Sequence, residues 1–139
     1  MKYIYSLLLL FPMFAQAEFL EIKDAWVRAA PPNARVMVAY ATVKNISTDS
    51  IWITGATSDH YKDVQIHETI EKDGLASMIH LNFIKLEAGK SVNFEPGGKH
   101  LMLFNANKPS TAGDQIDFNF HLGNGTQEAF TAIVSRNQP

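Results

Sequence analysis

The sequence predicts an all-β fold, a Greek-key β-sandwich of about nine strands in a single domain. Short apolar or alternating runs follow one another along the chain, and none keeps the period of a long helix. Clusters of Gly, Pro, Asn and Asp separate these runs. The expected strands cover residues 20–28, 37–45, 50–56, 64–70, 76–86, 91–94, 100–105, 115–122 and 127–135.

Turn residues define the ends of most expected strands. They lie at residues 31–33, 72–74, 87–89, 95–98 and 123–125. The polar connection 105–113, which contains Pro109, is longer than a tight hairpin needs. It therefore suits a crossover between the two sheets of a Greek key.

Alternation along each expected strand predicts the residues that face the core. The expected inward residues are Ile22, Trp26, Val38, Tyr40, Thr42, Ile51, Ile53, Val64, Ile66, Leu101, Leu103, Ile116, Phe118, Phe120, Phe130 and Ile133. If Leu101 and Leu103 point inward, His100 and Met102 point together to the opposite face.

The first 17 residues have the pattern of a secretory signal peptide. Lys2 supplies a positive charge, residues 3–14 are apolar, and Ala15-Gln16-Ala17 is typical of a cleavage site. The apolar run is shorter than the roughly 20 residues of a membrane-spanning helix. We therefore expect cleavage before Glu18, a folded domain over residues 18–139, and no membrane insertion after cleavage.

The charge of the predicted mature chain argues against nucleic acid as a partner. Without Lys2 it has eleven Lys and Arg against fourteen Asp and Glu, a formal charge of −3. No basic stripe is available to neutralise phosphates or anionic lipid headgroups. The chain also has no cysteine, so neither a disulfide nor a thiolate ligand or nucleophile is possible.

Two histidines and two methionines recur at spacings that suit strands. Ten residues separate His67 from Met78, twenty-one separate Met78 from His100, and one separates His100 from Met102. Thioether sulfur selects a soft metal and imidazole suits several metals, so this donor set favours Cu(I) over Ca²⁺ or Mg²⁺. Taken singly, each residue has a plainer interpretation, since a strand methionine is commonly core filler and a strand histidine commonly a surface residue. His80, on the same expected strand face as Met78, is either a spare ligand or an exposed residue.

These four residues and their flanks resemble the copper-binding motif of the periplasmic PCuAC copper chaperones. Similar flanks include residues 25–32, 40–45, 65–68 and 95–103, so the resemblance covers nearly all of residues 18–139. It implies a cupredoxin-like β-sandwich that binds one Cu(I) per chain through His67, Met78, His100 and Met102. It also implies delivery of copper to the binuclear copper centre of cytochrome oxidase. Many members have a methionine where this chain has Glu68, and some carry a His- and Met-rich tail where this chain ends at residues 135–139.

The expected protein is therefore a monomeric periplasmic metallochaperone and not an enzyme. Its expected partner is a copper-accepting protein, either the oxidase copper subunit or another copper chaperone. A blue-copper electron carrier is excluded because its site requires a cysteine, and no hydrolase motif is present. Two alternatives stay open: an Ig-like secreted binding or assembly module without metal, and copper sequestration for tolerance in place of delivery.

Overall fold

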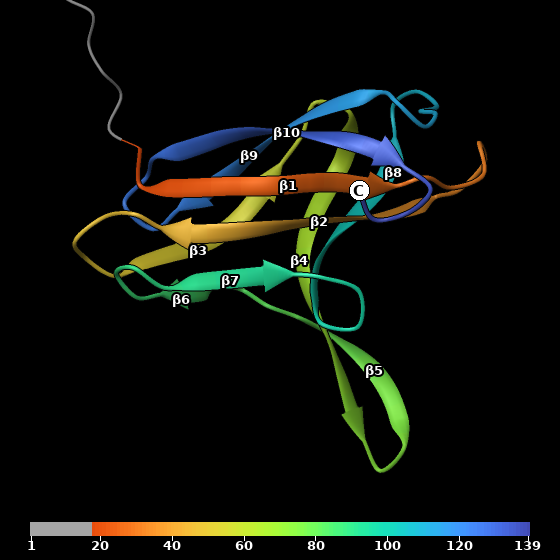
Figure 1. Cartoon of the computed structure of the whole chain (residues 1–139). Coiled ribbons are helices and arrows are strands. Elements are labelled where there is room, and N and C mark those ends of the chain that lie inside the picture. Colours follow the sequence, from red (N-terminus) through yellow and green to blue (C-terminus); the bar gives the residue numbers. More distant parts are fainter. Residues whose placement is uncertain (1–17) are drawn as a thin grey trace, which may run out of the picture.

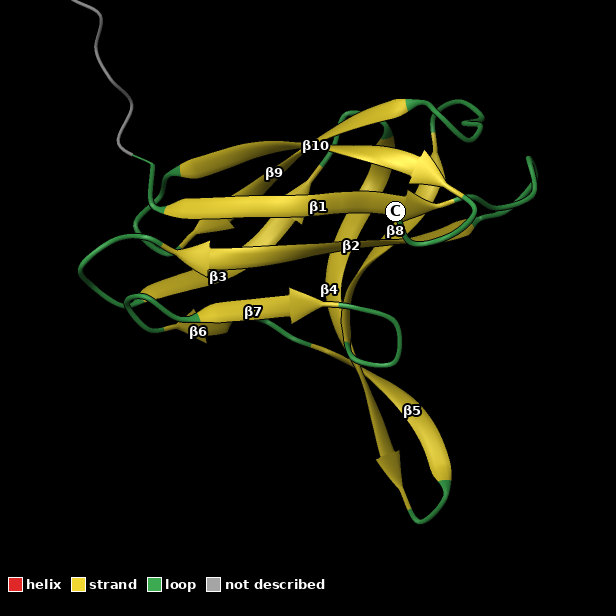
Figure 2. Cartoon of the chain, viewed as in Figure 1, coloured by secondary structure: helices red, strands yellow, loops and turns green. Residues whose placement is uncertain are grey.

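Residues 18–139 are described by the computed structural model, and they contain strands and turns but no helix (Figures 1 and 2). The predicted signal peptide lies outside these residues. The strands are β1 (Leu20–Arg28), β2 (Val36–Asn45), β3 (Ile51–Thr57), β4 (Tyr61–Lys72), β5 (Leu75–His80), β6 (Ile84–Leu86), β7 (Ser91–Phe94), β8 (Lys99–Ala106), β9 (Gln115–Leu122) and β10 (Gln127–Ser135). Seven of them match an expected strand within one residue at each end: β1, β2, β3, β7, β8, β9 and β10.

All ten strands belong to one sheet that folds over on itself. The order is β5-β4-β8-β7-β2-β1-β10-β9-β3-β6, with a further pairing of β8 with β2. Phe94 of β7 and Phe120 of β9 are far apart in this order, yet their ring centroids lie 5.8 Å apart. The two halves of the sheet therefore pack face to face across one core, which is the sandwich that the sequence predicts. The connection after β8 leads to β9 in the other half, as expected for a crossover.

The core is built from alternate residues of both halves, and much of it matches the prediction. The expected inward residues of β3, β4, β8 and β9 are all buried. Phe118 and Phe120 of β9 are fully buried and stack on Phe130 of β10, with centroids 5.3 and 4.8 Å apart. This aromatic cluster fills the space between the halves.

The inward faces predicted for β1 and β2 are wrong in part, and on β1 a bulge changes the alternation. Asp24 has a positive φ of 54°, and the pairing of β1 with β2 shifts between Lys23 and Trp26. Val27 enters the core as a result. Trp26 and Tyr40 are buried as well, but they stack on each other outside the core cluster with a centroid distance of 4.9 Å. On β2 the core set is Met37, Ala39, Ala41 and Val43 in place of Val38, Tyr40 and Thr42.

The inward face predicted for the last strand is also partly wrong. Phe130 packs against the core, but Ile133 is 42% exposed. Ala132 and Val134 are buried in its place. Residues 130, 132 and 134 keep the period of two, which an inward Ile133 would break.

The expected strand 76–86 is two strands, which is why the sheet has ten strands and not nine. β5 pairs with β4, whereas β6 pairs with β3 at the other end of the sheet order. Asp73 and Gly74, with φ of 54° and 77°, form the two-residue turn between β4 and β5. The resulting hairpin projects from the body of the sandwich (Figure 1). Met78 therefore lies on a projecting hairpin and not inside the sandwich.

Candidate metal centre

Three neighbouring strands, β5, β4 and β8, carry the candidate ligands on one face. His67 of β4 lies directly opposite His80 of β5 on one side and opposite His100 of β8 on the other. Directly opposed residues of antiparallel strands point to the same side of a sheet. The same register places Met102 opposite Gln65 and Met78 opposite Thr69. We call this surface the histidine face, and its defining residues are Gln65, His67, Met78, His80, His100 and Met102.

The histidine face turns away from the core. On β8, Leu101 and Leu103 are buried in the core and alternate with His100 and Met102. His100 is nevertheless only 4% exposed, whereas His67 is part-buried and His80 is exposed. The ring centroid of His67 lies 5.9 Å from that of His100, 5.4 Å from that of His80 and 6.4 Å from that of Phe104. His67 is thus the central ring of the row.

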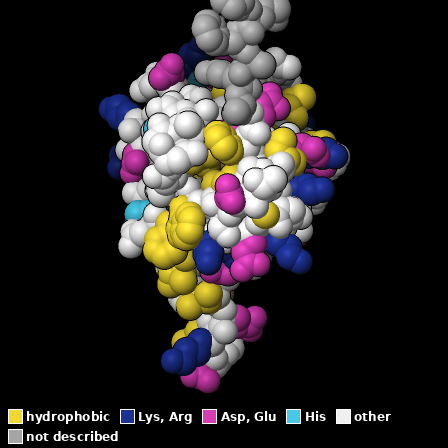
Figure 3. All heavy atoms as spheres, turned by 90° about the vertical axis from the view of Figure 1, so that its left-hand side faces the viewer, with side chains coloured by type: hydrophobic (Ala, Val, Ile, Leu, Met, Phe, Trp, Pro, Cys, Tyr) yellow, Lys and Arg dark blue, Asp and Glu magenta, His cyan; other side chains and the backbone are white. Residues whose placement is uncertain are grey.

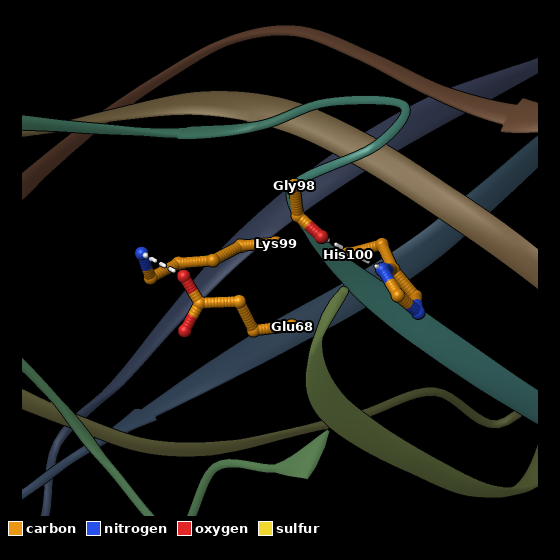
Figure 4. A network of polar contacts seen from close by, with 4 residues as sticks. All are labelled: Glu68, Gly98, Lys99 and His100. Carbon is orange, nitrogen blue, oxygen red and sulfur yellow. Dashed lines mark hydrogen bonds and ion pairs between the residues drawn. The ribbon is translucent and has the colours of Figure 1, made fainter. Parts of the chain in front are cut away.

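His67 and His100 each have one buried ring nitrogen without a hydrogen-bond partner. His100 Nδ1 lies 3.2 Å from the carbonyl oxygen of Gly98 (Figure 4). A carbonyl only accepts, so Nδ1 carries the hydrogen and Nε2 keeps its lone pair. His100 Nε2 and His67 Nδ1 are both buried and have no partner among residues 18–139. Buried polar atoms are normally satisfied, and a neutral imidazole nitrogen is a metal ligand, so these are the two atoms of the histidine face suited to bind a metal.

Methionine sulfur flanks the histidines on both sides. Met102 is part-buried, and Met78 is 56% exposed on the hairpin. Their partners Gln65 and Thr69 are four residues apart on β4, about 13 Å along a straight strand. The structure thus brings His67, His100 and Met102 together on adjacent strands, and it places Met78 on the outer strand with a long, flexible side chain toward solvent.

Glu68, the carboxylate next to His67, does not contribute to the histidine face. Glu68 and Lys99 lie next to His67 and His100 in the register, and so they point to the other side. Figure 4 shows the Glu68 carboxylate directed at Lys99 and away from His100, with Oε1 and Nζ 3.3 Å apart. Within residues 18–139, no group of three or more His, Cys, Asp or Glu side chains could hold a metal. Methionine sulfur is the soft donor that this face offers beside imidazole.

The hairpin beside the histidine face exposes several large apolar side chains. Ile70, Leu75, Met78 and Ile79 of the hairpin and Phe83 just after it are all exposed. In Figure 3 hydrophobic side chains gather in the lower part of the molecule and lead toward the projecting hairpin, where acidic and basic side chains also lie. Sequence alternation alone does not indicate this exposure, because it predicts residues 76–86 as one strand of the sandwich.

Burial and the neighbouring imidazoles both lower the pKa of His67. Desolvation lowers the pKa of His67 below its ordinary value of 6.5, and the neighbouring imidazoles of His80 and His100 lower it further. The neutral form, which is the form that binds a metal, therefore persists to lower pH than in a free histidine.

Acidification should consequently destabilise the metal-free protein through His67. The unfolded chain binds this proton more tightly than the folded chain, so the contribution of His67 to stability is present above pH 6.5 and is lost as pH falls through the folded pKa. An NMR titration of the imidazole protons, with His67→Gln as the assignment control, should give a midpoint for His67 below 6.5. A midpoint at or above 6.5 would contradict the burial argument.

The fold and the histidine face together define a class of protein, a cupredoxin-like β-sandwich with histidine and methionine gathered at one sheet edge. The chain belongs to the LpqE-like family, which matches residues 20–134. It is similar to "Putative lipoprotein Lxx21020" of Leifsonia xyli subsp. xyli, with 31% identity over 112 residues, 80% of this chain and 66% of that protein. It is also similar to RP573 of Rickettsia prowazekii, with 29% identity over 101 residues, 72% of this chain and 56% of that protein. The chain thus matches about two thirds or less of the length of these relatives.

Solved structures confirm the fold and the resemblance to PCuAC domains. The copper-bound PCuAC domain from PmoF2 has a TM-score of 0.72 with 20% identity, covering 88% of this chain and 97% of that domain. The Cu(I) form of DR1885 from Deinococcus radiodurans has a TM-score of 0.66 with 26% identity, covering 81% of this chain and 76% of that protein. Among residues 18–139 the structure contains no helix capable of crossing a membrane.

Proposed function

We propose that this protein is an exported copper chaperone that binds one Cu(I) through His67, Met78, His100 and Met102. The observation that carries the proposal is the pair of buried imidazole nitrogens without partners, one on His67 and one on His100. The Cu(I)-bound form of DR1885 supports the choice of metal, because it shares the fold and 26% of its sequence with this chain. The four proposed ligands supply imidazole nitrogen and thioether sulfur, which are donors that a soft monovalent metal prefers.

The geometry suits holding copper as a cargo. His100 is buried and its ring is fixed by the Gly98 carbonyl, so it is the anchored end of the site. Met78 is exposed on a projecting hairpin and is the ligand that a partner protein reaches first. All four ligands are neutral, and thioethers cannot be lost to disulfides in an oxidising compartment. A partner can therefore replace them one at a time, starting from the hairpin.

The partner in this proposal is a copper-accepting protein, either the copper subunit of cytochrome oxidase or another copper chaperone. Export follows from the signal peptide proposed for residues 1–17, which leaves residues 18–139 as a monomeric domain in the periplasm. Copper sequestration for tolerance would use the same ligands as delivery. Only a test of copper transfer to an acceptor protein therefore distinguishes sequestration from delivery. Mixing the Cu(I)-loaded protein with a metal-free oxidase copper domain should move copper to the acceptor, whereas retention of copper would favour sequestration.

Met102→Leu should weaken Cu(I) binding and leave the fold intact. Leucine keeps the approximate volume of methionine but removes the sulfur donor. Competition against a chromogenic Cu(I) chelator should show a loss of affinity of at least about tenfold, in the range of removing a supporting group from a metal site. Met37→Leu is the matched control, because Met37 lies in the core. Equal competition by wild type and Met102→Leu would remove Met102 from the site.

A metal-free assembly module predicts a different result with the same protein. Cu(I) should then give no thermal stabilisation, whereas a copper-binding protein is stabilised increasingly as free copper rises. The thermal shift under anaerobic conditions therefore tests copper binding, and the transfer assay tests delivery.

A further inference from the structure

Asp63, Gln65 and His67 form a chain of hydrogen bonds along β4. Their positions alternate with the core residues Val64 and Ile66, so all three side chains lie on the histidine face. Gln65 Nε2 donates to Asp63 Oδ2 at 2.7 Å, and Gln65 Oε1 lies 2.9 Å from His67 Nε2. The register also places Gln65 opposite Met102, so Gln65 neighbours two proposed copper ligands, His67 on its own strand and Met102 on β8.

The carboxylate of Asp63 sets the direction of this chain. A carboxylate only accepts, so the amide nitrogen of Gln65 must face Asp63 and the amide oxygen must face His67. The opposite amide orientation would place two acceptor oxygens 2.7 Å apart. Because the amide oxygen only accepts, the hydrogen of the neutral His67 ring is on Nε2. The lone pair is then on Nδ1, which is the buried atom of His67 without a partner.

We propose that Gln65, oriented by Asp63, is a positioning residue that commits His67 to bind Cu(I) through Nδ1. The proposal rests on the copper site proposed above. His100 uses the other ring atom, because its Nδ1 is engaged by the Gly98 carbonyl and its Nε2 is free. The site therefore takes one Nδ1 and one Nε2 ligand, and each is selected by an acceptor on the other side of its ring.

The tautomer of His67 in the metal-free protein tests the proposal without copper. Long-range ¹H–¹⁵N correlation spectra distinguish a protonated from an unprotonated ring nitrogen. Wild type should show His67 protonated at Nε2 and unprotonated at Nδ1. In Gln65→Ala the acceptor is gone, so His67 should become a mixture of tautomers, and Cu(I) affinity should fall about tenfold or more.

Rescue by a conservative variant distinguishes positioning from a general structural effect. The double variant Asp63→Asn with Gln65→Glu avoids two facing carboxylates and keeps an acceptor oxygen for His67 Nε2, so it should keep both the wild-type tautomer and at least most of the affinity. Gln127→Ala, on the exposed start of β10, is the matched control and should change neither. A wild-type His67 protonated at Nδ1, or a Gln65→Ala variant with unchanged tautomer and affinity, would overturn the proposal. A wild type with the expected tautomer that fails to bind Cu(I) would refute the proposed function instead and leave the positioning of the ring by Gln65 established.

Discussion

His100→Ala should reduce Cu(I) affinity by at least about a hundredfold, beyond the usual effect of removing a group that only supports a ligand. His100 is the most buried of the proposed ligands, and its ring orientation is fixed by the Gly98 carbonyl. Alanine removes the nitrogen donor and leaves no neighbouring carboxylate to replace it, because Glu68 points to the other side of the strand. Competition with a Cu(I) chelator under anaerobic conditions measures the loss.

The control for this experiment is His121→Ala. His121 lies on β9, where its Nε2 is 2.7 Å from the Thr57 hydroxyl, so it is a histidine of the same fold outside the histidine face. It should leave Cu(I) affinity unchanged. If both variants compete like wild type, His100 is not a copper ligand and the donor set proposed here is wrong.

Phe118→Ala should cost about 3–5 kcal/mol of unfolding free energy, the range for truncating a large aromatic side chain in a core. Phe118 is fully buried and stacks on Tyr61 of β4 and Phe130 of β10, with ring centroids 6.1 and 5.3 Å away. It therefore links the half of the sheet that carries the histidine face to the other half. Urea unfolding followed by tryptophan fluorescence measures the change.

Phe83→Ala provides the comparison, because Phe83 is 57% exposed. A surface substitution of this kind should change the unfolding free energy by no more than about 0.5 kcal/mol. Similar losses for the two variants would mean that Phe118 does not join the two halves as described.

Much of this fold follows from alternation and turn chemistry. The strands that become β1, β7, β9 and β10 have the predicted ends, and the Asp73-Gly74 turn sits between two strands as expected. The face of β8 was also predicted correctly, since Leu101 and Leu103 are buried and His100 and Met102 lie on the other side. These features depend on neighbours in sequence, which is why sequence suffices for them.

Two of the errors come from features that depend on distant strands. The bulge at Asp24 exchanges the faces of β1 around Trp26, and no residue pattern near it indicates a bulge. The break in the expected strand 76–86 arises because β5 pairs with β4 while β6 pairs with β3. The period of two does not show which strand β5 or β6 pairs with, so neither pairing can be identified from the sequence pattern alone.

The role inferred for Gln65 was within reach of the sequence but not identified from it. Residues 63, 65 and 67 share a face by alternation, so a carboxylate, an amide and an imidazole in a row could have indicated a hydrogen-bonded chain. What the sequence could not supply is the orientation of the amide, which depends on the distances to Asp63 and His67.

X-ray absorption spectroscopy of the anaerobically loaded protein tests the donor set most directly. With one Cu(I) bound per chain, we predict a coordination shell containing both imidazole nitrogen and thioether sulfur, with the sulfur contribution reduced in Met102→Leu. A shell of nitrogen and oxygen alone, or no copper retained after removal of excess metal, would contradict the claim that His67, Met78, His100 and Met102 bind copper.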